Sequence, residues 1–152
     1  MAGSSSGDGA DEASLIYVVG RVNQGIRREM RARLAAVDLS VQEYTALSVL
    51  RARPGLSNAQ LARRSLVAPQ SMLETLAKLE ARGLAVREVD PEHGRILRAR
   101  LTPPGRELLA AADPSILAIQ EQLLADVPER DRAIVLRGMV SAMGRLSTGL
   151  DA

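Results

Sequence analysis

The stretch "SNAQLARRSLVAPQSMLETLAKLEARGL", residues 57–84, contains two short helical patterns with few residues between them. Ser57 and Gln60 have the spacing of a capping box, in which each side chain bonds the other residue's backbone at a helix start. Pro69 suits the first turn of a second helix, where its missing N–H costs nothing. Apolar residues then recur every three or four positions until Gly83, a residue typical of a helix C-cap. Two short helices in such close succession predict a helix-turn-helix.

The segment that follows changes its period from helical to alternating. "LAVREV" (84–89) and "RILRARL" (95–101) nearly alternate apolar and polar residues, and "DPEHG" (90–94) supplies turn residues between them. In the second segment the apolar residues fall on one face and two arginines on the other. These patterns predict a two-stranded hairpin and, with the preceding helices, a winged helix-turn-helix over about 40–101.

Long amphipathic helices are predicted on both sides of this module, over about 14–37 and 103–148. Ser14 can cap the first of them. Pro114 lies inside the second, so either that helix kinks near Asp113 or Asp113 caps a fresh segment. The apolar stripes of these helices need a partner, and a second copy of the chain supplies one. The predicted fold is thus mainly α with a small two-stranded β wing, in a single domain flanked by dimerisation helices.

Shorter signals predict where the other helices begin. "SVQE" (40–43) is a capping box that opens a helix ending at "RPG" (53–55). Thr102 can cap the helix that starts with two prolines. "DVPE" (126–129) is an Asp-to-Glu capping box before the last helix.

Composition excludes several classes of function. The chain of 152 residues has no cysteine and one histidine, His93, so we expect no disulfide, no metal site and no cofactor. It contains no apolar run of the roughly 18 residues that a membrane helix needs. Residues 1–13 are rich in Gly, Ser and acid, and we expect a disordered arm there. Without a secretory signal, the expected location is the cytoplasm.

The charge of the chain is unevenly distributed. Residues 51–106 carry eleven basic and five acidic side chains, a net charge of +6, whereas the remainder carries nine basic and thirteen acidic ones, a net charge of −4. A basic middle between acidic flanks is typical of a nucleic-acid-binding module inside a larger dimer. An ordinary solvated surface is the alternative interpretation.

A helix-turn-helix presents the N-terminal residues of its second helix to base edges in the major groove of DNA. Gln70 can pair with adenine, and Ser71 with a base or a phosphate. Lys78 and Arg82 lie further along and suit phosphates, and Ser57 and Asn58 can cradle a phosphate at the first helix start. The hairpin arginines can reach phosphate or the minor groove, or they merely keep an exposed strand soluble. The candidate DNA-binding residues are Ser57, Asn58, Pro69, Gln70, Ser71, Glu74, Thr75, Lys78, Arg95 and Arg98.

Over about residues 15–148 the sequence resembles the multiple antibiotic resistance regulator (MarR) family of bacterial transcription factors. The pattern of that family is a Leu-Ala pair, then Leu-Glu-x-x-Gly-Leu, R-x-x-D-P, a basic wing and L-T-x-x-G. Each piece alone is weak, but their order is specific. Here the pieces are Leu61-Ala62, Leu79 to Leu84, Arg87 to Pro91, Arg95 and Leu101 to Gly105.

The resemblance implies a triangular homodimer that binds a palindromic operator in double-stranded DNA and acts as a regulator, typically a repressor. It implies that Arg95 enters the minor groove and that Asp90 braces the wing. It also implies a pocket between the dimerisation helices and the winged module for a small aromatic or anionic effector. Tyr17, Arg21 and Tyr44 are the candidate pocket residues, and simple packing of the tyrosines is the alternative.

The sequence departs from the family pattern at three positions. His93 stands where the wing often has a second acid, and Glu74 where an arginine often reads bases. Pro114 is not expected in a continuous dimerisation helix. Two rival functions are an enzyme, for which no catalytic motif is present, and a winged-helix module that binds protein. Salt dependence separates the last from a DNA reader, because phosphate contacts make affinity fall steeply with salt.

Overall fold

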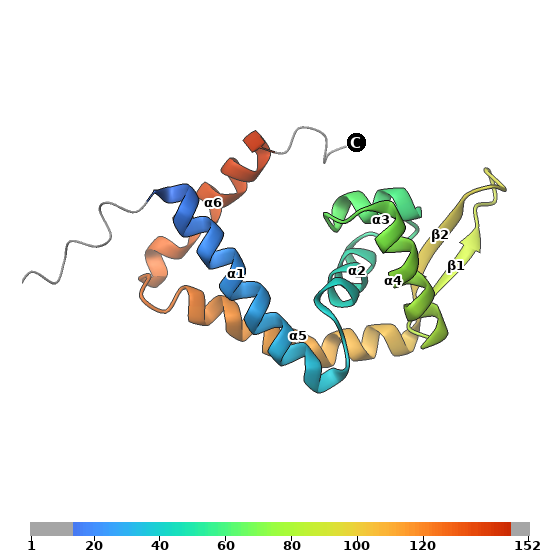
Figure 1. Ribbon diagram of the computed structural model, residues 1–152, viewed down its shortest axis with the longest axis horizontal. Coiled ribbons are helices and arrows are strands. Elements are labelled where there is room, and N and C mark those ends of the chain that lie inside the picture. The colour runs from blue at the N-terminus through green and yellow to red at the C-terminus, as the bar shows by residue number, and fades with distance from the viewer. Residues whose placement is uncertain (1–13, 147–152) are drawn as a thin grey trace, which may run out of the picture.

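The computed structural model describes residues 14–146, so the N-terminal segment 1–13, which we expected to be disordered, lies outside the described residues. Helix α1 (Leu15–Leu34) is followed by a short 3₁₀ helix, η1 (Ala35–Val37). Ser14 stands at the N-cap of α1, but its side chain makes no capping hydrogen bond. Figure 1 shows α1 running from the end of the molecule near α6 down to α5.

The helix-turn-helix has the boundaries that its capping signals predict. The two helices of this motif are α3 (Asn58–Arg64) and α4 (Pro69–Ala81), and α2 (Val41–Ala52) precedes them. Ser40 and Ser57 each complete a capping box with the residue three positions on, so both reciprocal hydrogen bonds are present. Local hydrogen bonds therefore determine where α2 and α3 begin.

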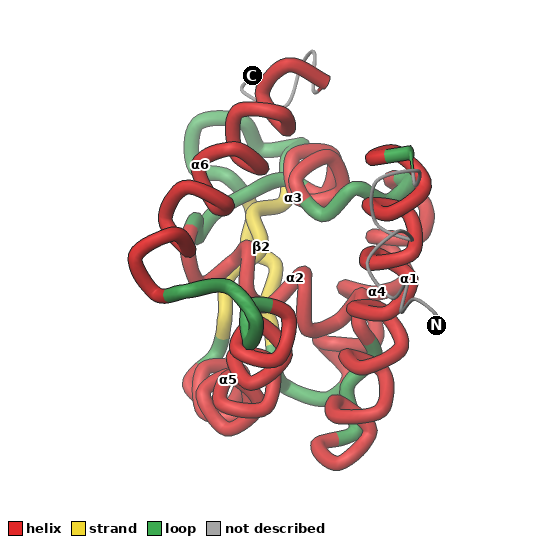
Figure 2. The backbone as a smooth tube through the Cα atoms, turned by 90° about the vertical axis from the view of Figure 1, so that its left-hand side faces the viewer, coloured by secondary structure: helices red, strands yellow, loops and turns green. Residues whose placement is uncertain are grey.

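The wing is an antiparallel hairpin of β1 (Ala85–Val89) and β2 (Leu97–Leu101). Gly83, between α4 and β1, has φ +68°, as its predicted C-cap role requires. Leu56 adds a one-residue third strand, which the sequence pattern did not predict: its carbonyl accepts from Ala99 N at 2.8 Å. The middle of β2 is thus fastened to the loop between α2 and α3. Figure 1 shows the hairpin at one end of the molecule beside α4, and Figure 2, seen from the opposite end, shows the strands behind the helices.

Helix α5 (Pro103–Leu123) is continuous through Pro114, so Asp113 does not begin a new helix. The proline removes one backbone hydrogen bond and crowds the carbonyl one turn back, at a cost of about 3 kcal/mol that other contacts must offset. The residue before a proline disfavours helical backbone. Asp113 is nevertheless held in the helix by side-chain hydrogen bonds from Tyr44 and Arg51.

The first turn of α5 packs against Leu84, which lies between α4 and β1. Thr102 caps the helix by accepting from Gly105 N at 3.2 Å. A Cβ atom at Gly105 would lie 2.0 Å from the carbonyl oxygen of Leu84. The glycine of the L-T-x-x-G motif is therefore required by close approach of two backbone segments.

The core lies where the end of α1 and the first half of α5 meet the helix-turn-helix. It is aliphatic, as the near absence of aromatic residues implies. The C-terminal end of α1 and the N-terminal half of α5 thus belong to the core of the winged module. The largest fully buried side chains are Leu34, Leu47, Leu50, Leu61, Met72, Leu76, Leu79 and Leu109.

The other ends of these helices are not buried. We call residues 15–22 of α1 and the whole of α6 (Glu129–Leu146) the arms; they contain no buried residue in the described chain. Figure 1 shows both arms at the end of the molecule opposite the hairpin. The exposed large apolar side chains of the arms are Leu15, Ile16, Tyr17, Val18, Val19, Val22, Ile134, Val135, Leu136, Met139, Val140, Met143 and Leu146.

Candidate nucleic-acid interface

The outer face of α4 carries most of the predicted base-reading side chains. Gln70, Glu74 and Lys78 follow one another at intervals of four residues, and all three are exposed. Pro69 is exposed at the first helical position. Leu73, which periodicity assigns to the core side, is instead 41% exposed beside them. An exposed leucine there can contact a thymine methyl group. The hydrophobic pattern alone did not indicate this contact, because it predicts a buried side chain.

Thr75 faces the interior, which corrects its assignment to the groove. The residue is buried, and its hydroxyl accepts from Gln42 Nε2 at 2.6 Å while donating to the carbonyl of Ser71 at 2.9 Å. Gln42 Nε2 also donates to that carbonyl at 3.1 Å. Thr75 therefore fastens α4 to α2, and the half-buried Ser71 presents only part of its surface.

The start of α3 is joined to the start of α4. Ser57 Oγ is engaged in the capping box, accepting from Gln60 N at 3.3 Å. Asn58 Nδ2 donates to the carbonyl of Pro69 at 3.0 Å. The predicted phosphate-cradling role of Ser57 and Asn58 stays a prediction, and in the structure both side chains serve to hold helix starts in place.

Glu80 and Arg87 connect two pieces of the family motif. Arg87 Nη2 lies 2.5 Å from Glu80 Oε2, and the Arg87 backbone N–H donates to Glu80 Oε1 at 3.1 Å. The hydrogen bond from Arg87 is the main reason that the pKa of Glu80 is lowered. This pair fixes the exit of α4 against β1, which explains why the two pieces occur together.

The turn of the wing separates an available arginine from an engaged one. Arg95 is exposed, and within residues 14–146 we find no hydrogen bond or ion pair of its guanidinium. Arg98 is half-buried and lies 2.7 Å from Asp90 Oδ2 through both Nε and Nη2. Arg98 thus has partners inside the domain, which its position in an exposed alternating strand did not reveal.

Asp90 has the contacts expected of a residue that braces the wing. It is only 7% exposed, and its Oδ1 accepts from the backbone N–H groups of Glu92 and His93 at 2.8 and 3.3 Å. The backbone hydrogen bond from Glu92, followed by that from the Arg98 side chain, lowers the pKa of Asp90. The carboxylate therefore stays ionised and tied to the turn.

Arg82, which we expected to meet phosphate, is turned toward the end of η1. Its Nη1 donates to the carbonyl of Asp38 at 2.7 Å and lies 3.7 Å from Glu43 Oε1. The C-terminal end of α4 is thereby held to the segment that connects η1 with α2.

Tyr44, a predicted pocket residue, is engaged in a contact between α2 and α5. Its hydroxyl donates to Asp113 Oδ1 at 2.9 Å, and Arg51 Nη1 lies 2.5 Å from Asp113 Oδ2. The hydrogen bond from Arg51 lowers the pKa of Asp113 despite partial burial, and burial together with the Asp113 contact raises the pKa of Tyr44. These three side chains join the winged module to the long helix.

The three predicted pocket residues do not share one cavity. Tyr17 is 62% exposed in an arm, and Tyr44 is engaged with Asp113. Arg21 lines a cavity of about 550 Å³ along α1, whose other lining residues come from the same helix. The proposed pocket thus needs other residues than sequence reasoning selected.

A cavity of about 580 Å³, here called the α1–α2 cavity, lies between the dimerisation helix and the winged module. Arg27 and Arg31 form its basic side, and Thr45 and Ser65 contribute hydroxyl-bearing residues. Within residues 14–146 the buried Ser65 hydroxyl has no hydrogen-bond partner. The lining residues are Arg27, Arg31, Ala35, Leu39, Ser40, Val41, Gln42, Thr45, Ser65 and Val67.

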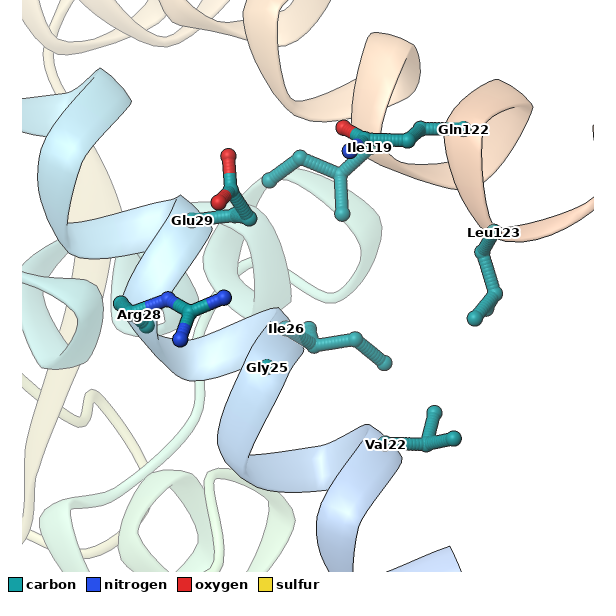
Figure 3. A pocket seen from close by; sticks show the side chains of 8 residues that line it. All are labelled: Val22, Gly25, Ile26, Arg28, Glu29, Ile119, Gln122 and Leu123. Atoms are coloured by element: carbon teal, nitrogen blue, oxygen red, sulfur yellow. The ribbon is translucent and has the colours of Figure 1, made fainter.

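A second cavity, of about 310 Å³, lies between α1 and α5 and is here called the α1–α5 cavity (Figure 3). Figure 3 shows apolar side chains of the two helices, such as Val22 and Leu123, at its wall. Arg28, Glu29 and Gln122 are its larger polar lining residues.

Within the described residues there is no cluster of three or more side chains suited to a metal ion. No described helix is long and apolar enough to cross a membrane.

Comparison with known proteins agrees with this geometry. The model of the MarR family matches residues 37–96. The HTH-type transcriptional repressor Rv2887 of Mycobacterium tuberculosis is 40% identical over 116 residues, which cover 76% of this chain and 84% of the repressor.

Two solved structures of Rv2887 extend the similarity to the fold. The complex of the M. tuberculosis protein with salicylic acid has a TM-score of 0.71 and 35% identity, and the match covers 88% of this chain and 98% of that one. The complex with DNA has a TM-score of 0.72 and 33% identity, with 88% and 99% covered. Motif order, winged fold and extensive similarity lead to one conclusion: this chain belongs to the MarR family of winged helix-turn-helix transcriptional regulators.

Proposed function

We propose that this protein is a homodimeric repressor that binds a two-fold symmetric operator and is released by a small aromatic or anionic effector. The observation that carries the proposal is the exposed row of Gln70, Glu74 and Lys78 on α4, beside a wing whose tip presents Arg95. A helix of this kind fits the major groove, and an arginine fits the adjacent minor groove. The complex of the similar protein Rv2887 with DNA supports the proposal that this chain binds DNA.

The exposed apolar residues of the arms support dimerisation. A row such as Leu136, Val140 and Met143 is costly to leave in water, and each such side chain gains about 1.5–3 kcal/mol on full burial. A second copy related by a two-fold axis would cover both arms. It would also place the two copies of α4 in successive major grooves about 34 Å apart.

The side chains of α4 suggest which bases the operator contains. The amide of Gln70 can bond adenine N6 and N7 together, and the carboxylate of Glu74 can accept from cytosine N4. Because Glu74 repels phosphate, it needs this base contact for the helix to dock closely. We expect Gln70→Ala to cost about 1–3 kcal/mol in operator affinity and to relax specificity at one position per half-site.

Fluorescence anisotropy of labelled DNA from the gene's upstream intergenic region tests the proposal. We expect tight, salt-sensitive binding to this duplex and much weaker binding to a scrambled duplex, because each phosphate contact contributes roughly one unit of salt slope. Equal, weak and salt-insensitive binding to both would contradict it. That outcome would favour a winged-helix module that binds protein, a reading for which exposed Leu73 is the supporting observation.

The α1–α2 cavity is the proposed effector site. It lies where the dimerisation helix meets the module, so a ligand there can change the angle between them. Arg27 and Arg31 provide positive charge for a carboxylate, Ser65 an unused hydroxyl, and Val41 and Val67 apolar surface for a ring. The complex of Rv2887 with salicylic acid indicates the class of ligand.

Salicylic acid is the probe for this site. We expect it to weaken operator binding by the wild-type protein and to lose most of that effect in Arg31→Ala. Arg28→Ala is the matched control, because Arg28 lines the α1–α5 cavity and not the α1–α2 cavity. Loss of the effect in Arg28→Ala alone would move the effector site to the α1–α5 cavity. As a DNA-binding regulator the protein is proposed to act in the cytoplasm and to catalyse no reaction.

A further inference from the structure

Arg98 bridges the wing and α3, although the two are 38 residues apart in the chain. While Nε and Nη2 hold Asp90, Nη1 donates to Gln60 Oε1 at 3.1 Å. All three guanidinium nitrogens are therefore engaged within the protein. A phosphate could bind Arg98 only in addition to these partners or by displacing them.

Gln60 receives two hydrogen bonds at the same oxygen. Its Oε1 accepts from Ser57 N at 3.0 Å as well as from Arg98. The side chain that closes the capping box of α3 is thus also the end point of the wing arginine. Asn58 then carries the connection to Pro69 at the start of α4.

The hydrogen-bonded series Asp90–Arg98–Gln60–Ser57 starts at the turn of the wing and ends at the start of α3. Asp90 is buried and ionised, so it requires the positive charge of Arg98 to stay paired. The backbone bridge at Ala99 holds the middle of the wing, opposite Arg87, and does not extend to the turn. The side-chain series is therefore the part that reaches toward Arg95 at its tip.

We propose that Arg98 and Gln60 are positioning residues for DNA binding rather than DNA contacts. Together with Asp90 they set the wing relative to α3 and α4, so that Arg95 and the α4 row reach the operator at the same time. This inference rests on the proposed DNA-binding function. It assigns to Arg98 an action through Arg95, which gives a measurable coupling between the two arginines.

A double-mutant cycle of Arg95→Ala and Arg98→Ala tests the coupling, with operator affinity measured by anisotropy at several salt concentrations. We expect each single variant to lose about tenfold in affinity and roughly one unit of salt slope. In the Arg95→Ala background, Arg98→Ala should add less than about threefold, because the residue it positions is already gone. Losses that multiply to about a hundredfold, with a slope lower by roughly two, would instead make Arg98 an independent phosphate contact.

Conservative variants separate positioning from charge. Arg98→Lys keeps the charge but cannot reach Asp90 and Gln60 together, so it should lose affinity as Arg98→Ala does. Gln60→Ala removes the accepting oxygen and should resemble Arg98→Ala. Wild-type affinity in both Arg98→Lys and Gln60→Ala would overturn the proposal, and both variants also serve if Arg98→Ala does not fold.

Arg100→Ala is the matched control for loss of charge on the same strand. Arg100 is exposed, and its ion pair with Glu88 at 3.6 Å is confined to the hairpin. It should lose less than about threefold in affinity; an effect equal to that of Arg98→Ala would indicate general electrostatics and contradict the positioning role. If wild-type protein itself shows no salt-sensitive preference for the operator, the proposed function fails. Wild-type binding with additive arginine losses would refute the positioning proposal alone.

Discussion

The winged module and the arms solve the problem of apolar surface in opposite ways. In the module, leucines such as Leu47, Leu61 and Leu76 are fully buried, and side-chain hydrogen bonds fasten α4 to α2 and β2 to α3. In the arms, apolar side chains at the same helical spacing remain exposed. The same amphipathic pattern therefore belongs to a core helix in one region and to an exposed surface, proposed to bind a second chain, in the other. What decides is whether another part of the same chain lies opposite.

Gly105→Ala tests how closely the module is packed and should have the largest effect. The new Cβ would meet the carbonyl oxygen of Leu84 at 2.0 Å, and both atoms belong to backbone segments that cannot turn aside. We expect a loss of about 3 kcal/mol or more in the free energy of unfolding, measured by urea denaturation. Gly144→Ala in α6 is the control, since among residues 14–146, outside its own stretch of helix, no atom lies within 4 Å of its added Cβ. Similar losses in both variants would remove the contrast between module and arms.

Val140→Glu tests whether a second chain covers the arms. A carboxylate placed in the row of Leu136 and Met143 would be buried without a partner in a dimer. We expect the dissociation constant of the dimer to rise by at least about a hundredfold, equivalent to about 2.7 kcal/mol, as measured by light scattering over a concentration series. Ser141→Glu adds the same charge beside Arg137 and should leave dimerisation nearly unchanged. An unaltered dimer in Val140→Glu would mean that this row of α6 is not the interface.

Asp113→Asn tests the polar junction that joins the module to α5. At pH 7 we expect a loss of about 2 kcal/mol in the free energy of unfolding, because hydrogen bonds to a charged group from Tyr44 and Arg51 are weakened. The pKa of Asp113 is lowered in the folded protein, so its ionised form stabilises the fold above the unfolded-state value of about 3.9. That stability is lost as pH falls through the lower folded-state pKa. The free energies of unfolding of wild type and variant should therefore converge as pH falls below about 3.9 and through the lower folded-state pKa, and a constant difference would exclude the ionised pair as its source.

Leu66→Gly should have the smallest effect, and it should raise the free energy of unfolding relative to Leu66→Ala. Leu66 lies in the turn between α3 and α4 with φ +57°, a conformation that costs a residue with a Cβ about 1 kcal/mol or more, and its side chain is 74% exposed. We expect the free energy of unfolding of Leu66→Gly to exceed that of Leu66→Ala by about 1 kcal/mol, measured by thermal denaturation. If Leu66→Ala alone costs several times that amount, Leu66 is covered by the partner chain and belongs with the arms.

Local hydrogen bonds explain why much of the fold was predictable. Ser40 and Ser57 form their capping boxes with residues three positions away, and Gly83 adopts the left-handed conformation expected of it. The exposed Gln70 and Arg95 follow from the positions of α4 and the hairpin, which local patterns already mark. Such features depend on neighbours in the chain, so a single sequence contains the necessary information.

The errors concern residues whose partners lie far away in the sequence. Thr75 was assigned to the groove, but Gln42, 33 residues earlier, draws it inward. Arg82 was assigned to phosphate, but Asp38, 44 residues earlier, holds it. Of the two alternatives at Pro114, a fresh helix capped by Asp113 is not formed: α5 continues through the proline while Asp113 contacts α2. In each case a long-range side-chain contact overrode a local tendency.

Periodicity and caps act over a few residues, so they were enough to predict the order of the helices, the hairpin, the aliphatic core and the exposed face of α4. Which polar side chains remain free for a ligand depends instead on contacts between distant parts of the folded chain. Arg95 and Arg98 are three residues apart and chemically identical, yet Asp90 and Gln60 occupy only the second. The physical reason is that an arginine's availability is set by what lies within hydrogen-bonding distance, and folding brings those groups together from distant parts of the chain.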